Sequence, residues 1–264
     1  MSFTESDLRF VAETIASSPQ KREEALRVLR ERSDLLEDLL ENPRIFDRIW
    51  REEETLVRIS PYLLFHILLR QVRRFLHERL YVYEVGTRGE RLPVFEAPQV
   101  AELLEDREVL DYLAHMLASF ARTQSGVIYW EEGGHWRKRR ISDIDMDDMI
   151  FLARLVEPAL RPLLMKRVAD IALFLSGIYP EHASLFIARP KTAFTAKRTI
   201  RDYENEGTTF YRIASEQLDD PRMQRTCRRL SESFTLARRA LNTLSEEYLA
   251  RLQERLGGSA LGEN

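Results

Sequence analysis

The sequence predicts a mostly α-helical fold, a multi-helix bundle that carries two short β-hairpins. Apolar residues recur every three or four positions along most of the chain, which is the period of a helix with one buried face. Helix-start signals recur before these stretches, and only two segments, at about 81–95 and 127–141, change to strand-like patterns around glycine-containing turns. With 44% hydrophobic and 31% charged residues, the chain has enough apolar side chains for a core.

The N-terminal helices are marked by clear start signals. Thr4 and Asp7 have the spacing of a capping box. Ser60 followed by Pro61 combines an N-cap with proline at the first helical position, and it starts an apolar helix over 61–80 that we expect at the centre of this half. Shorter helices are expected between these signals at 20–33, 34–42 and 43–50.

The later helices follow the same kinds of signal. A break near Asp106 divides 97–124 into two helices, and Ser142 with Asp145 predicts another capping box. Pro158 and Pro162 should interrupt the helix that follows. The remaining boundaries are expected at Gly177, a loop-rich connection over 179–194, a helix over 196–218, a start at Asp220–Pro221, and a last segment from Ser245 to Gly258.

Both predicted hairpins have glycine in the turn between two short strands. The turn is 86–90 ("GTRGE") in the first hairpin and Gly133–Gly134 in the second. An isolated two-stranded hairpin is only marginally stable in water, so each must lie on helices or pair with the other. We expect the two hairpins to pair in one small sheet, because both have an aromatic or β-branched face to cover.

The chain is predicted to form a single mostly helical domain over 1–258, with a subdivision near residue 96 as the alternative and a disordered tail at 259–264. The N-terminus lacks the pattern of a signal peptide, and the longest apolar windows are about half of the ~20 residues that a spanning helix needs. We therefore expect a cytoplasmic protein with no membrane partner. The single cysteine, Cys227, excludes an intramolecular disulfide and is expected to be buried.

The second hairpin contains the most unusual stretch of the chain, "YWEEGGHWRKRR" at 129–140. A two-residue turn at Gly133–Gly134 places Trp130 opposite Arg137, where a cation–π pair is expected. Strand alternation then separates two faces: one has Ile128, Trp130, Arg137 and Arg139, and the other has Val127, Tyr129, Trp136, Lys138 and Arg140. The predicted contacts with an acidic partner or a nucleic acid are Trp130, Trp136, Arg137, Lys138, Arg139 and Arg140.

The overall charge gives little support to a nucleic-acid partner. The chain has 40 basic and 43 acidic residues, a formal net charge of −3, so any such binding must depend on a local patch. A second basic stripe is expected on one helix, formed by Arg222, Arg225 and Arg229. Four aspartates directly follow the basic strand, so internal ion pairing is the favoured role of the hairpin, with an acidic protein or phosphate partner and a nucleic acid as alternatives. These aspartates are Asp143, Asp145, Asp147 and Asp148.

Gly207 lies inside a predicted helix, "YENEGTTFYRIA", where glycine costs ~1 kcal/mol relative to alanine. Two explanations are open: the close approach of a neighbouring helix, or a ligand that lies over the backbone. The second explanation predicts a ligand pocket formed by Tyr203, Gly207, Phe210 and Tyr211.

Motifs for catalysis or for metal binding are weak. The sequence has no phosphate-binding glycine loop, no nucleophile elbow and no recognisable Cys/His arrangement, and we predict no cofactor. Asp111 and His115 are four residues apart on one predicted helix, and Asp202 and Glu206 repeat that spacing on another. If the two pairs faced each other, they would provide four ligands for a divalent ion.

Four stretches, taken in order, resemble an uncharacterised group of bacterial, mostly helical proteins: "DYLAHMLASFART", "VADIALFLSGIYPEH", "YENEGTTFYRIASE" and "LSESFTLARRALNTLSE". They span about 111–247. The resemblance implies a mostly helical architecture, and it implies no activity and no binding residue. For function we expect a non-enzymatic cytosolic module that binds a protein partner or forms a homodimer. The alternatives are a helical-bundle enzyme or small-ligand binder with a pocket near Gly207, and a nucleic-acid-associated protein that uses the basic strand 136–140.

Overall fold

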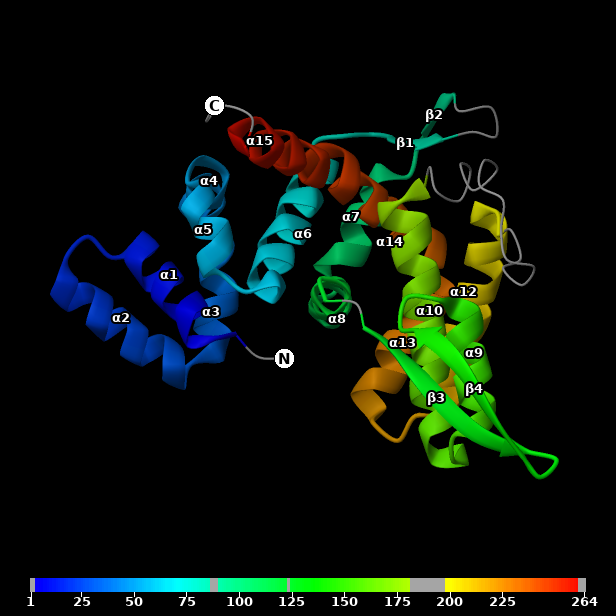
Figure 1. The fold of residues 1–264 in the computed structure, drawn as a ribbon. Coiled ribbons are helices and arrows are strands. Elements are labelled where there is room, and N and C mark those ends of the chain that lie inside the picture. Colours follow the sequence, from blue (N-terminus) through cyan, green and yellow to red (C-terminus); the bar gives the residue numbers. More distant parts are fainter. Residues whose placement is uncertain (1–2, 86–89, 123, 181–197, 261–264) are drawn as a thin grey trace.

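The computed structural model describes residues 3–85, 90–122, 124–180 and 198–260, and it has the mostly helical architecture with two β-hairpins that the sequence predicts (Figure 1). The N-terminal helices are α1 (Glu5–Ile15), α2 (Pro19–Glu31), α3 (Ser33–Leu39), α4 (Pro43–Arg51), α5 (Glu53–Arg58) and α6 (Pro61–His77). The first hairpin is β1 (Val82–Val85) and β2 (Arg91–Val94), followed by α7 (Ala97–Glu105) and α8 (Arg107–Phe120). The second hairpin is β3 (Ser125–Glu132) and β4 (His135–Ser142).

The C-terminal half is helical throughout its described part. It contains α9 (Met146–Leu155), a 3-10 turn η1 (Pro158–Leu160), α10 (Arg161–Ile178), α12 (Ile200–Gln217), α13 (Pro221–Glu232), α14 (Phe234–Leu244), a π-helical turn η2 (Ser245–Leu249) and α15 (Ala250–Ala260). The loop-rich connection expected at 179–194 lies almost entirely outside the described residues. Helix α15 continues two residues into the segment that was expected to be disordered, and the rest of that tail is also outside the described residues.

Local capping explains most of the helix boundaries. Thr4 and Asp7 form the predicted capping box, and Ser60 caps α6 with Pro61 at its first position. Asp106 caps α8, at the predicted break. The prediction at Ser142 was wrong by one turn: Asp145 is the N-cap of α9, and Ser142 ends β4 because its amide donates to the carboxylate of Asp148.

Two clusters of buried side chains form the core, and α6 contributes to both. The smaller cluster joins α1 to α5 with one face of α6, through residues such as Phe10, Ile45 and Ile67. The larger one joins the opposite side of α6 with α7, α8, α10 and the C-terminal helices. The subdivision near residue 96 stays a prediction. The C-terminal segment also returns to the N-terminal helices, where Tyr248 packs edge-on against Phe46 and Trp50.

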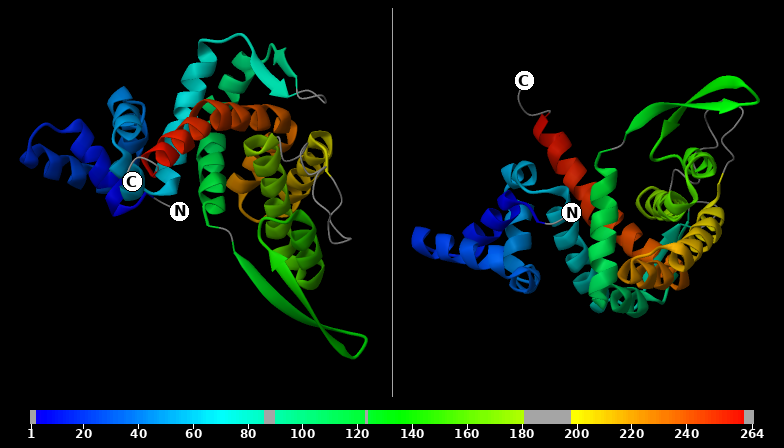
Figure 2. Two further views of the ribbon diagram at one scale, coloured as in Figure 1. Left: turned by 45° about the horizontal axis from the view of Figure 1, so that its top comes forward. Right: turned by 90° about the horizontal axis from the view of Figure 1, so that it is seen from below.

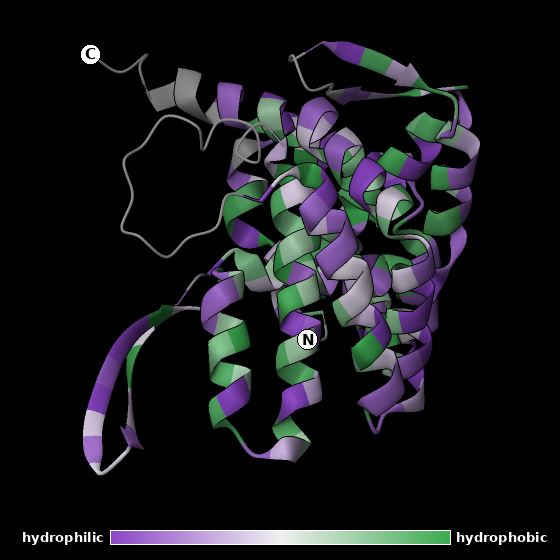
Figure 3. Ribbon diagram, turned by 90° about the vertical axis from the view of Figure 1, so that its right-hand side faces the viewer, coloured by the Kyte–Doolittle hydropathy of each residue, from purple (hydrophilic) through white to green (hydrophobic). Residues whose placement is uncertain are grey.

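The two hairpins form separate two-stranded sheets, so the expectation that they pair with each other was wrong. They lie at opposite ends of the molecule in Figure 1 and Figure 3. Helices cover the inner side of each hairpin instead: β1 contacts α14, and β4 contacts α9. The second hairpin extends well beyond the helices into solvent (Figure 2).

Candidate functional site

The β3–β4 hairpin has the turn and the strand register that its sequence predicts. Gly133 and Gly134 have φ angles of 61° and 77°, the left-handed values that a two-residue type I′ turn requires. The register pairs Glu132 with His135, and Trp130 with Arg137. Because strand side chains alternate between faces, this register fixes which residues point towards the helices and which point to solvent.

The inner face of this hairpin is anchored on α9. The ring of Trp130 lies edge-on to Phe151, with the ring centroids 5.0 Å apart. The guanidinium of Arg139 lies 4.7 Å from the centre of the same Phe151 ring and donates to Asp148 at 2.6 Å. Arg137, which was expected to stack on Trp130, instead pairs with Glu132 across the turn at 2.7 Å. In this hairpin, the cation that lies over an aromatic ring is therefore Arg139, and the ring is that of Phe151.

The outer face exposes an apolar stripe between two cations. Val127, Tyr129 and Trp136 have exposed fractions of 52%, 65% and 75%. The register places Arg140 opposite Val127 and Lys138 opposite Tyr129. Within the described part of the chain neither cation has an ion pair, although Arg140 donates to the hydroxyl of Ser125 at 3.3 Å. We call these five side chains the outer face.

The four aspartates after the hairpin do not balance its charge as expected. Only Asp148 accepts a cation from the hairpin, Arg139. Asp143 pairs with Arg167, Asp147 pairs with Arg198, and Asp145 caps α9. All four aspartates thus have partners other than Lys138 and Arg140, so these two cations stay available to a partner.

The arginine stripe on α13 is largely paired. Arg222 lies 3.4 Å from Asp111 and 3.5 Å from Glu108, and Arg225 lies 3.2 Å from Glu108. Arg229 is exposed. In the right-hand view of Figure 2, α13 and the second hairpin lie on opposite sides of α10, so the two basic regions do not form one surface.

A pocket of about 550 Å³, lined by both charged and apolar side chains, lies between α8, α10 and α13. At its base, the buried carboxylate of Asp170 accepts from Tyr112 at 2.5 Å, from Tyr211 at 2.8 Å and from Lys166 at 2.7 Å. Burial, followed by the charge of Asp170, raises the pKa of both tyrosines well above the ordinary value. The phenols therefore stay protonated, and Asp170 is held by three donors, Tyr112, Tyr211 and Lys166.

Asp111 and His115, the first half of the predicted metal site, line the same pocket. Asp111 accepts from Tyr62, and the Nε2 atoms of His66 and His115 lie 3.6 Å and 3.7 Å from its Oδ1 atom. Although burial acts in the opposite direction, the contacts from His66 and Tyr62 bring the pKa of Asp111 to about 2. Asp111 is thus an anion that orders the side chains around it.

The second half of the predicted metal site is elsewhere. Asp202 closes the capping box of α12 with Thr199, and Glu206 pairs with Arg198 at 2.9 Å. Among the residues that the structure describes, no group of three or more His, Cys, Asp or Glu side chains could hold a metal ion, so the predicted four-ligand arrangement was wrong.

The space above Gly207 is filled by a side chain of this protein. A Cβ atom at Gly207 would lie only 2.2 Å from the ring of Phe234, the first residue of α14. Tyr211, from the predicted ligand pocket, is fully buried and donates to Asp170. Tyr203 and Phe210 are half-buried against the main core. Gly207 therefore allows close packing of α12 and α14, which supports the first of its two explanations.

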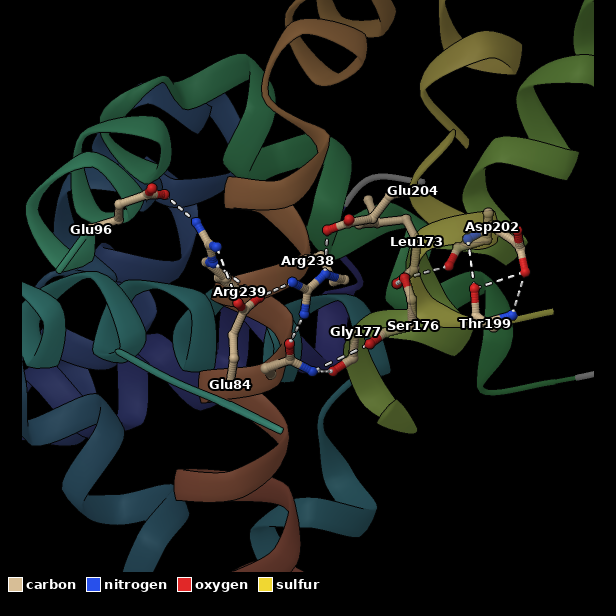
Figure 4. A network of polar contacts seen from close by, with 12 residues as sticks. Glu84, Glu96, Leu173, Ser176, Gly177, Thr199, Asp202, Glu204, Arg238 and Arg239 are labelled. Carbon is tan, nitrogen blue, oxygen red and sulfur yellow. Dashed lines mark hydrogen bonds and ion pairs between the residues drawn. The ribbon is translucent and has the colours of Figure 1, made fainter. Parts of the chain in front are cut away.

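One buried polar network, drawn in Figure 4, was not predicted from the sequence. Arg238 and Arg239 on α14 are almost fully buried, and both donate to Glu84 of β1. Arg238 also pairs with Glu204 at 2.8 Å, and Arg239 pairs with Glu96. The sequence signal that could have indicated this network is the pair of arginines inside the otherwise apolar stretch "FTLARRALNTL". Cations that are buried with such a stretch need several acceptors nearby.

No protein-family model matches the chain, and no curated protein and no solved structure is similar to it. Within its described residues the structure also has no helix that is long and apolar enough to cross a membrane.

Proposed function

We propose that the protein is a non-enzymatic protein-interaction module that binds an acidic partner through the outer face of the β3–β4 hairpin. The observation that carries the proposal is the exposure of Val127, Tyr129 and Trp136 on one face of a projecting ribbon. Large aromatic side chains are typical anchors at protein interfaces, because they bury much area with few rotatable bonds.

The charges on the same face indicate the chemistry of the partner. Lys138 and Arg140 flank the apolar stripe, and the acids nearest in sequence are used elsewhere. A partner with an apolar groove edged by carboxylates would complement both features. Electrostatic complementarity of this kind mainly increases the association rate, so binding should weaken as the salt concentration rises.

Affinity capture with four forms of the immobilised protein tests the proposal. The forms are the wild type, an apolar variant (Tyr129→Ser with Trp136→Ser), a charge variant (Lys138→Glu with Arg140→Glu), and a control at the two ends of the other hairpin (Leu80→Ser with Phe95→Ser). The control residues are similarly exposed, at 72% and 68%. A captured protein is then purified and titrated directly against each form.

We expect the purified partner to bind the apolar and charge variants at least tenfold more weakly than the wild type, and the control equally well. Equal binding to all four forms would contradict the proposal. Retardation of a 30-base-pair DNA duplex or an RNA strand at low ionic strength, lost in the charge variant but not the apolar one, would replace it with the nucleic-acid alternative.

A further inference from the structure

The β3–β4 hairpin has two free edges with very different chemistry. Gln124 accepts from the amide of Asp143, so even-numbered residues of β3 direct their backbone groups towards β4. The odd-numbered residues therefore direct theirs to the opposite edge. These residues are Ser125, Val127, Tyr129 and Glu131, and in the described part of the chain their backbone groups have no backbone partner outside the hairpin.

We propose that a second copy of the chain pairs with this edge, antiparallel β3 to β3, to form a two-fold four-stranded sheet. The proposal goes beyond the proposed function, because the occupant is a second copy of the chain, held mainly by the backbone edge of β3, and not an acidic partner on the outer face. A two-stranded sheet alone is marginally stable in water, whereas three or more strands are stable. In the new sheet, the free β3 edges of the two copies would lie side by side, and the backbone groups of each would pair with those of the other.

The sequence of β3 is complementary to itself in this arrangement. With the two-fold axis at Ile128, Val127 lies opposite Tyr129 of the second copy, a β-branched and aromatic pair that favours antiparallel strands. Gly126 lies opposite Trp130 of the second copy. A Cβ atom at Gly126 would meet nothing within 4 Å, so there is room for that indole ring over the glycine. About eight new backbone hydrogen bonds would form between Ser125 and Glu131 of the two copies.

Charge decides between the two edges. Four consecutive cations, Arg137 to Arg140, occupy β4, and positive charge on an edge strand is a common protection against self-association. Pairing β4 with β4 would place these cations about 5 Å apart. Pairing β3 with β3 separates the two β4 strands by three strand spacings, roughly 14 Å, which exceeds the Debye length of about 8 Å at physiological salt. Only the β3 edge is suited to a second copy.

Two matched proline variants test the proposal in the purified protein. Val127→Pro removes an amide from the free edge of β3, and Lys138→Pro removes the equivalent amide from the free edge of β4. Sedimentation analysis over a concentration series should show a dimer for the wild type and for Lys138→Pro, and a monomer for Val127→Pro. Far-UV circular dichroism checks that both variants keep the helical fold.

A measurement on the unmodified protein covers the case in which a proline variant fails to fold. Amide exchange in β3 should slow as the concentration rises, with no change in β4. A wild type that stays monomeric, or a dimer that both proline variants retain, would overturn the proposal. Since no partner is present in these experiments, their outcome is independent of whether the outer face binds an acidic protein.

Discussion

The two hairpins have the same antiparallel topology, but their attachment to the helices differs. In β1–β2, Glu84 reaches two buried arginines of α14, and Arg91 pairs with Glu246 at 2.5 Å. In β3–β4, the inner face meets α9 through Trp130 and Arg139, and the rest extends into solvent. The first hairpin is part of the helical body, and the second is a projecting ribbon. Strand pattern and turn chemistry alone therefore do not indicate the role of a hairpin.

The largest expected effect is at the anchor of the first hairpin. Glu84→Ala should lower the free energy of unfolding by about 3 kcal/mol, because it leaves the buried cations Arg238 and Arg239 without a shared carboxylate. Glu131→Ala, the matched change in an exposed position of the second hairpin, should change it by less than ~0.5 kcal/mol. Urea unfolding of both variants measures the difference. Equal losses in the free energy of unfolding would contradict the claim that the first hairpin is part of the helical body and the second is not.

The contribution of Glu84 should also depend on pH. Burial alone would raise the pKa of Glu84. The hydrogen bonds and charges of Arg239 and Arg238 outweigh burial and lower this pKa below its ordinary value of 4.5. A carboxylate with a lowered pKa stabilises the fold above its unfolded pKa, and this contribution is lost as the pH falls through the folded pKa. The stability difference between the wild type and Glu84→Gln should therefore be largest near neutral pH and shrink below about pH 4.5. A difference that stays constant down to pH 3 would contradict this account.

The two tryptophans of the second hairpin compare its inner and outer faces. Trp130→Ala should cost about 2 kcal/mol, because this half-buried ring packs on Phe151. Trp136→Ala should change stability by less than ~0.5 kcal/mol, because the ring is 75% exposed. Thermal unfolding distinguishes them, and a large loss for Trp136→Ala would show that the outer face is structural.

The smallest effect is expected at the glycines of the same hairpin. Gly134→Ala should cost about 1 kcal/mol, because φ is 77° and a Cβ atom is strained there. Gly126→Ala, in the strand, meets no atom within 4 Å and should be tolerated. Chemical denaturation compares the two variants, and an equal cost at both positions would show that the left-handed turn is not the cause.

Local features of the fold follow from the sequence, whereas long-range contacts do not. The capping box of Thr4, the start at Ser60–Pro61 and the hairpin register depend on residues within a few positions of each other. The network around Arg238 joins residues more than 150 positions apart, so no local pattern predicts that β1 lies beside α14.

The candidate site shows the same division: its local features were predictable from the sequence, and its long-range contacts were not. Alternation correctly separated Trp130 from Trp136, because it depends only on strand geometry and the turn. The free charge of Lys138 and Arg140 was not predictable, because the aspartates that follow bind Arg167 and Arg198, which are distant in sequence. The Gly207 pocket was predicted from an unusual glycine, but the partner of that glycine, Phe234, is also distant.

The most direct test of the central claim is site-specific photo-crosslinking in living cells. A photoreactive phenylalanine derivative replaces Trp136 on the outer face, or the similarly exposed Phe95, which directly follows the first hairpin. We expect a protein adduct from position 136 that disappears when Lys138 and Arg140 are changed to Glu, and none from position 95. No adduct at 136, or the same adduct from both positions, would contradict the claim that the outer face of β3–β4 is the binding surface.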